Sequence, residues 1–126
     1  MKPSVTSHFC VLAALLVATA PTLLSAQVAD PDPRRFADAI AEFAAYDAKN
    51  SFPADATLFV GSSSTVRWDT GNSFPGMPLL NRGFGGSQMS DAVYWVEETV
   101  LKYSPRTVVL YEGDNDTSAG KRSQQL

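Results

Sequence analysis

The sequence TLFVGSSSTVRW, residues 57–68, decides how this chain can fold. Thr57 to Val60 form a short, continuous apolar run, which is typical of a strand buried on both faces of a parallel sheet. Gly61 and three serines follow at once, and Ser64 to Asp69 predict one or two helical turns. A strand, a glycine turn and a helix in this order indicate one unit of an α/β protein.

Two more strands are predicted further along the chain. Pro78 to Asn81 (PLLN) is short and apolar, and Thr107 to Tyr111 (TVVLY) is rich in β-branched residues. Residues 69–78 contain glycine, proline and asparagine, so they predict a turn-rich loop between the first two strands.

Helical segments separate the strands. Residues 34–50 carry apolar side chains at helical spacing, and Asp32, followed by proline, can cap this helix. Residues 88–102 carry a second apolar stripe, which Ser87 or Ser90 can cap. The alternation predicts an α/β fold with a parallel sheet and helices on both faces, in three layers.

Residues 1–26 are predicted to be a secretory signal peptide. Lys2 supplies the positive start, Phe9 to Ala20 form a twelve-residue apolar run, and small residues end at Ala26, where cleavage is expected. The apolar run is too short to span a bilayer, which takes about 20 residues. The chain is therefore expected to be exported, to the periplasm or outside the cell, without a stable membrane anchor.

The composition excludes several kinds of function. The net charge is −3, which argues against a nucleic-acid partner, because such proteins usually have a basic face. His8 and Cys10 are the only histidine and the only cysteine, and both lie in the predicted signal peptide. The mature chain would form no disulfide, no cysteine-based zinc site, no cysteine nucleophile and no histidine relay. The sequence implies no metal or organic cofactor.

Each predicted strand ends in a polar turn that contains glycine. These turns are residues 61–64, 83–87 and 113–116. In a parallel sheet they emerge at one edge, which is where such sheets bind ligands. The residue types suit acyl transfer, because a serine can attack a carbonyl while a glycine N–H and an asparagine amide stabilise the oxyanion. Each such donor contributes roughly 3 kcal/mol to lowering the barrier.

The three turns resemble the first three sequence blocks of the SGNH (GDSL-type) hydrolases, which are esterases and lipases with a flavodoxin-like α/β fold. The resemblance implies that Ser63 is the nucleophile and that its own N–H is one oxyanion donor. It also implies that Gly86 supplies a second donor and Asn115 a third. Ser62 stands where the family most often has aspartate. The implied substrate is a small-molecule ester.

The fourth block of the family, Asp-x-x-His, has no counterpart in this sequence. Glu112 and Asp114 are acidic and near the third turn, but neither matches a base position of the family, so the general base stays unassigned. Residues 27–126 are therefore expected to be the N-terminal part of an esterase domain, incomplete at the C-terminus. We expect this chain alone to be almost inactive, and its third strand to present an open edge.

A second interpretation fits the same residues. The chain could be a secreted binding module that keeps the crevice without the catalysis, for an acylated saccharide or another small ester ligand. Separately, Ser62 to Ser64 could simply cap a helix, and Asn115 could simply stabilise a turn. Neither the substrate nor the oligomeric state follows from the sequence.

Overall fold

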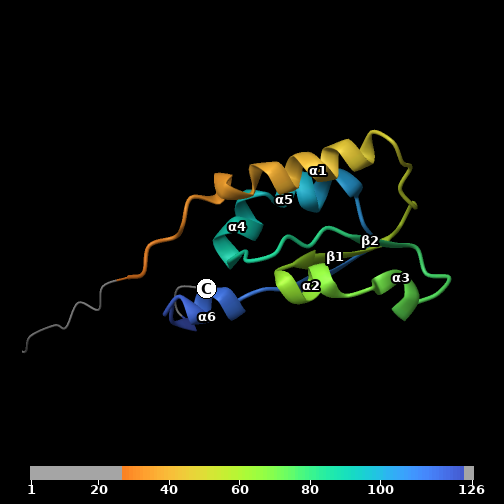
Figure 1. Cartoon of the computed structure of the whole chain (residues 1–126). Coiled ribbons are helices and arrows are strands. Elements are labelled where there is room, and N and C mark those ends of the chain that lie inside the picture. Colours follow the sequence, from red (N-terminus) through yellow and green to blue (C-terminus); the bar gives the residue numbers. More distant parts are fainter. Residues whose placement is uncertain (1–26, 124–126) are drawn as a thin grey trace, which may run out of the picture.

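A computed structural model describes residues 27–123, so the predicted signal peptide lies outside the described residues. Helices and strands alternate along this part of the chain (Figure 1). The elements are, in order, η1 (Pro33–Phe36), α1 (Ala37–Asp47), β1 (Thr57–Gly61), α2 (Ser63–Arg67), α3 (Thr70–Ser73), β2 (Leu79–Asn81), α4 (Met89–Tyr94), α5 (Val96–Thr99), η2 (Leu101–Tyr103), β3 (Thr107–Tyr111) and α6 (Asp114–Ser118). No helix within residues 27–123 is long and apolar enough to cross a membrane.

The three strands form one parallel sheet in the order β2-β1-β3, which confirms the predicted fold class. Thr57 pairs with Leu79 on one side and with Thr107 on the other. This order is that of the first three strands of flavodoxin-like sheets. β1 is central because its side chains are apolar on both faces, and Leu58 and Phe59 are both buried.

Helices cover both faces of the sheet, as the alternating pattern predicts (Figure 1). α1, α4 and α5 lie over one face, where the largest apolar cluster forms. Its buried members are Ile40, Ala56, Leu58, Val60, Leu80, Phe84 and Val100. α2 and α3 lie over the other face, where the Phe59 ring contacts Trp68 at 5.3 Å and Phe74 at 5.9 Å between ring centroids.

The prediction for residues 69–78 was wrong in one part, because α3 forms inside the expected loop. The Asp69 carboxylate accepts a hydrogen bond from Asn72 N–H over 3.2 Å and so caps this single helical turn. Asp32 is the cap that the sequence predicts, since its side chain accepts from Arg34 N–H over 3.0 Å, but it caps the 3-10 turn η1. The α-helix itself runs from Ala37 to Asp47, so it starts later and ends earlier than the expected helix over residues 34–50.

The prediction of one continuous helix over residues 88–102 was also wrong, since this segment forms α4, α5 and η2 in succession. The breaks fall at Trp95 (φ −96°, ψ 14°) and Val100 (φ −128°, ψ −62°). The Thr99 hydroxyl donates to the Trp95 carbonyl over 2.8 Å, a type of bond that bends helices.

The cap of this segment also differs from the expectation. Gln88 is the N-cap of α4, in place of Ser87 or Ser90. Its backbone N–H donates to the Asp91 carboxylate over 2.8 Å. A serine caps a helix by accepting a hydrogen bond with its side-chain oxygen. The Ser87 hydroxyl instead donates to the Phe84 carbonyl.

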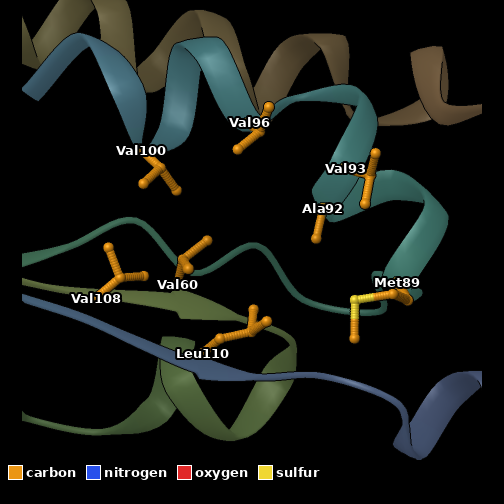
Figure 2. Close-up of a pocket in the computed structure, with 8 residues that line it drawn as sticks. All are labelled: Val60, Met89, Ala92, Val93, Val96, Val100, Val108 and Leu110. Carbon is orange, nitrogen blue, oxygen red and sulfur yellow. The ribbon is translucent and has the colours of Figure 1, made fainter. Parts of the chain in front are cut away.

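β3 has the predicted bounds, but all five of its residues are exposed. It pairs with β1 on one side, and no other described strand lies on its far side. On the α4–α5 face, this edge leaves an apolar groove of about 170 Å³, lined by side chains of β1, β3, α4 and α5 and by Val100 (Figure 2). The other face carries a second groove, which lies between α2 and β3 and includes Trp68 and Tyr111.

Candidate active site

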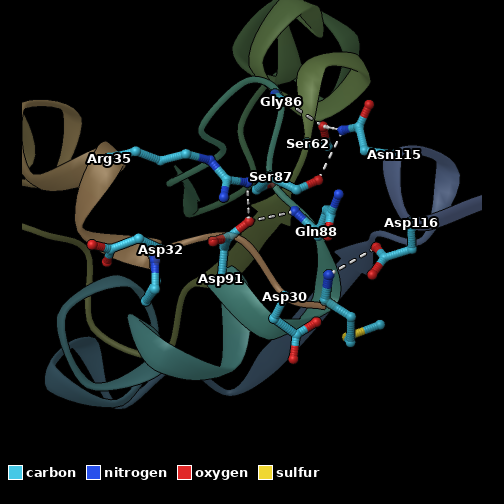
Figure 3. Close-up of polar contacts among 12 residues, drawn as sticks. Asp30, Asp32, Arg35, Ser62, Gly86, Ser87, Gln88, Asp91, Asn115 and Asp116 are labelled. Carbon is cyan, nitrogen blue, oxygen red and sulfur yellow. Dashed lines mark hydrogen bonds and ion pairs between the residues drawn. The ribbon is translucent and has the colours of Figure 1, made fainter. Parts of the chain in front are cut away.

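Three loops meet at the carboxyl edge of the sheet. Ser62 follows β1, Gly86 lies in the loop after β2, and Asn115 lies in the first turn of α6 after β3. Figure 3 shows these three residues close together, joined by hydrogen bonds. The structure thus brings one residue from each of the three polar turns to a single point, at the edge where α/β sheets bind ligands.

Gly61 makes this meeting possible because its backbone passes very close to β3. Its φ is +143°, and a Cβ at this position would lie 2.1 Å from the carbonyl oxygen of Tyr111. The next residue, Ser62, donates its backbone N–H to the same oxygen over 3.1 Å. Only glycine leaves room for β1 and β3 to remain paired up to the serine turn.

The hydroxyl of Ser62 lies at the centre of the site. Ser62 is 2% exposed, and its Oγ accepts hydrogen bonds from Gly86 N–H over 3.2 Å and from Asn115 Nδ2 over 2.5 Å. Asn115 Nδ2 also donates to the Ser87 carbonyl over 2.8 Å, which fixes the amide. A hydroxyl oxygen can accept two hydrogen bonds. Two donors from separate loops therefore converge on one oxygen atom.

Ser63, the predicted nucleophile, is the first residue of α2 and is half-buried. A Cβ built on Gly85 would lie 4.0 Å from both Cα and Cβ of Ser63, so this serine faces the same loop that supplies Gly86. The predicted set of Ser63, Gly86 and Asn115 therefore lies together at one edge. Gly86 N–H and Asn115 Nδ2, however, both donate to Oγ of Ser62, the residue before the predicted nucleophile.

Sequence reasoning missed the role of Ser62, which it treated as a departure from the usual aspartate or as part of a capping turn. Ser62 is the N-cap residue of α2, but its side chain does not make a capping hydrogen bond. A partial signal was present, because a polar side chain directly after a buried strand must find hydrogen-bond partners if it is itself buried. Its partners lie 24 and 53 residues away along the chain. Nothing in the local sequence identifies them.

Glu112 lies beside this site and is half-buried. Burial raises its pKa to about 7, and the negative charges of Asp116 and Asp91 add to the increase, against a hydrogen bond from Ser87 that lowers it. The Ser87 hydroxyl has one proton but contacts two acceptors, the Phe84 carbonyl at 3.0 Å and Glu112 Oε1. A protonated Glu112 resolves this conflict, because it can donate to Ser87 Oγ while Ser87 donates to Phe84.

We expect the free energy of unfolding to decrease as pH rises from about 4.5 to about 7. The unfolded chain has the ordinary glutamate pKa of 4.5, so in this range the folded state holds the extra proton of Glu112. Since Glu112 is half-buried, solvent screening reduces the effect to about 1–2 kcal/mol. Urea unfolding at a series of pH values measures it.

Two variants make this measurement specific to Glu112. Glu112→Gln should lose this part of the pH dependence, because glutamine does not titrate. Asp114→Asn, which alters an exposed carboxylate two residues away, should keep the wild-type slope. An identical slope in wild type and Glu112→Gln would refute the assignment.

A buried charge cluster holds the start of α4 against α6. Asp116 is fully buried, and its carboxylate accepts from Met89 N–H over 2.9 Å and from Lys121 Nζ over 2.9 Å. Burial alone would lower the pKa of Lys121, but hydrogen bonds to Asp30 and Asp116 outweigh it and raise that pKa. This cluster ties Asp116, the residue after Asn115, to the first residue of α4.

The described residues supply neither a histidine base nor a metal centre. The one histidine of the sequence is His8, outside residues 27–123. Among the carboxylates near the site, Asp114 accepts from the Tyr111 hydroxyl over 2.7 Å, and Glu112 contacts Ser87. No group of three or more histidine, cysteine, aspartate or glutamate side chains within residues 27–123 could hold a metal ion.

Comparison with known proteins adds no family assignment. No profile of a known protein family matches the chain, and no curated protein matches it either.

Proposed function

We propose that this site performs the acyl-transfer half of ester hydrolysis, in the manner of the SGNH-type serine esterases. One observation carries the proposal: Gly86 N–H and Asn115 Nδ2, from loops after two different strands, converge on one oxygen atom beside Ser63. Preorganised donors of this kind are what an oxyanion requires. The three-turn resemblance in the sequence supports the same assignment.

In the proposed reaction, Ser63 Oγ attacks the carbonyl carbon of a small ester. The negative charge that develops on the carbonyl oxygen is stabilised by the N–H groups of Ser63 and Gly86 and by the amide of Asn115. Collapse of this intermediate expels the alcohol and leaves an acylated serine, which water hydrolyses. The carbonyl oxygen of the ester would replace the Ser62 hydroxyl as the acceptor for Gly86 N–H and Asn115 Nδ2.

The proton of Ser63 needs a base, and a serine without one is a weak nucleophile. The SGNH resemblance assigns that role to a histidine outside the residues that match here. In a serine protease whose triad residues were removed, the oxyanion donors and substrate binding alone still accelerated the reaction about 10³–10⁴-fold over water. We therefore expect slow acylation by this chain and little turnover.

A test of this proposal measures covalent labelling instead of turnover. The purified chain is incubated for hours with a fluorophosphonate, and labelled peptides are identified by mass spectrometry. We expect slow modification at Ser63 that is lost in Ser63→Ala. Modification confined to Ser64, or none above the level of Ser63→Ala, would contradict the proposed nucleophile.

A second candidate function is a non-catalytic module that binds small ester ligands. It is favoured by the same convergence of donors combined with the lack of a histidine among the described residues. It predicts saturable binding of a short-chain ester without any labelled serine. Isothermal titration measures this binding, which Asn115→Ala should weaken, and the absence of serine labelling then separates the module from the esterase.

A further inference from the structure

Ser87 links two of the proposed oxyanion donors. Its hydroxyl donates to the Phe84 carbonyl over 3.0 Å, and this bond closes the four-residue turn that carries Gly86. Its backbone carbonyl accepts from Asn115 Nδ2 over 2.8 Å (Figure 3). Ser87 is fully buried, so bulk water does not replace a partner that either group loses. One residue therefore holds both Gly86 N–H and the Asn115 amide in place.

Packing does little to fix the shape of this turn. Its two inner residues are Gly85 and Gly86, and Gly86 has a φ of +89°. A Cβ at Gly86 would meet no atom within 4 Å, and a Cβ at Gly85 would only touch Ser63 at 4.0 Å. Because glycine loses the most conformational freedom on folding, a turn with two glycines needs a bond across it. The bond from the Ser87 hydroxyl to the Phe84 carbonyl supplies this restraint.

Glu112 decides where the Ser87 hydroxyl donates its proton. Glu112 Oε1 contacts Ser87 Oγ, so the hydroxyl has two acceptors within reach and one proton to give. A protonated Glu112 donates to Ser87 Oγ and leaves the bond to the Phe84 carbonyl intact. An ionised Glu112 can only accept, so it draws the Ser87 proton away from Phe84. The protonation state of Glu112 is thus coupled to the turn that carries Gly86.

The surroundings of Glu112 favour its protonated form. Burial raises its pKa to about 7, and the negative charges of Asp116 on α6 and Asp91 on α4 add to the increase. The nearby cations pair with those two aspartates, Arg35 with Asp91 over 2.5 Å and Lys121 with Asp116 over 2.9 Å. Glu112 Oε2 is buried and has no hydrogen-bond partner in the described part of the chain, which penalises the ionised carboxylate further.

We propose that Glu112 is a positioning residue of the candidate active site, whose protonated side chain holds Gly86 and Asn115 in place through Ser87. Its importance for ester hydrolysis rests on the proposed function. Loss of the Glu112 proton releases the bond across the glycine turn, so Gly86 N–H and the Asn115 amide no longer converge on one oxygen atom. The site is therefore competent while Glu112 is protonated and impaired once it is ionised.

Nuclear magnetic resonance of the full chain tests this positioning without any reaction. The backbone amide signal of Gly86 and the side-chain amide signals of Asn115 are followed from about pH 5.5 to about pH 8.5. In wild type, both should shift with a midpoint near pH 7. In Glu112→Gln, whose amide can donate to Ser87 as the protonated acid does, neither should shift. His8 is present in both proteins, so its titration cancels in the comparison.

Ser87→Ala separates positioning from the electric field of the ionised carboxylate. This variant keeps Glu112 but lacks the hydroxyl, so the pH-dependent shift of Gly86 should lose most of its amplitude. Asp114→Asn, which alters an exposed carboxylate two residues from Glu112, should keep the wild-type titration. Wild-type signals that do not move, or shifts of wild-type size in Glu112→Gln or Ser87→Ala, would overturn the proposal.

Covalent labelling with the fluorophosphonate distinguishes this inference from the proposed function. Removal of an oxyanion donor slows a reaction about 10²–10³-fold, so donors that are only loosened should slow it about tenfold. Labelling of Ser63 in wild type, relative to Glu112→Gln, should therefore slow about tenfold from about pH 5.5 to about pH 8.5. An unchanged ratio would overturn the role of Glu112 and leave the nucleophile standing. If neither protein is labelled but the wild-type signals shift as expected, the proposed function fails and the positioning by Glu112 stands.

Discussion

Gly61→Ala should destabilise the chain by about 3–5 kcal/mol, enough to unfold a domain of this size. The new Cβ would lie 2.1 Å from the Tyr111 carbonyl oxygen and 2.8 Å from its carbon, and both atoms are backbone of the neighbouring strand. A flexible side chain could move aside, but β3 could move only by breaking its pairing with β1. The φ of +143° adds strain that alanine does not tolerate.

Urea unfolding followed by circular dichroism measures this effect. Gly71→Ala is the matched control, since Gly71 lies in α3 with an ordinary φ, and its nearest contact would be the Asp69 carboxylate at 3.8 Å. This control should be neutral or slightly stabilising, because alanine restricts the unfolded chain. Equal effects of the two substitutions would show that the approach between β1 and β3 is looser than the structure describes.

Asp47→Ala should be the other strongly destabilising change, by about 3–5 kcal/mol. Asp47 ends α1 and forms an ion pair with Arg82 over 2.6 Å, and Arg82 is only 5% exposed. Tyr103 and Lys102 also contact the second carboxylate oxygen, each at 2.6 Å. Without Asp47, the Arg82 guanidinium would stay buried with no opposite charge described next to it.

This ion pair also supports the candidate active site. Arg82 begins the loop that carries Gly86, and its backbone N–H donates to the Phe59 carbonyl over 2.8 Å. Asp47 therefore ties α1 to the loop between β2 and α4. We expect Asp47→Ala to reduce any Ser63 labelling as well as stability, because Gly86 would lose its fixed position.

The pH dependence of this ion pair has the opposite sign to that of Glu112. Burial raises the pKa of Asp47, but hydrogen bonds from Lys102 and Tyr103 and the charge of Arg82 outweigh it, so that pKa is lowered. The stabilisation from Asp47 is thus present above the ordinary aspartate pKa of 3.8 and is lost as pH falls through the lower folded value. Asp47→Ala should therefore be less harmful in strong acid than at neutral pH.

Asp38→Ala is the matched control for this experiment. Asp38 lies in the first turn of the same helix and is exposed, so its removal should cost less than about 1 kcal/mol. A cost for Asp47→Ala similar to that for Asp38→Ala at neutral pH would contradict the buried ion pair.

The breaks between α4, α5 and η2 could not be predicted from the local sequence. The apolar stripe over residues 88–102 is only partly buried, since Val96 and Val100 pack against the core while Val93 is 64% exposed. It did not predict the break at Trp95, whose indole N–H donates to the Pro33 carbonyl over 2.9 Å. That partner lies 62 residues earlier in the chain, so helical periodicity carries no information about it.

The candidate site also depends partly on local sequence and partly on contacts that only the folded chain makes. The glycine and serine turns follow from the residues themselves, because a buried strand that ends in glycine and serine can only continue as a tight polar turn. The parallel sheet then implies that all three turns share an edge. The choice of Ser62 Oγ as the acceptor for Gly86 and Asn115 depends on distances between three separate loops, which only the folded chain sets.

By itself, the sequence determined the fold class, the three strands and the edge on which the polar turns gather, because side-chain polarity and backbone preference act locally. Tertiary structure alone decided which serine accepts the donors, how Arg82 is neutralised and why Glu112 titrates near neutrality. These properties arise from desolvation and from contacts between residues distant in the chain. Both depend on which groups the packed core places together and shields from water.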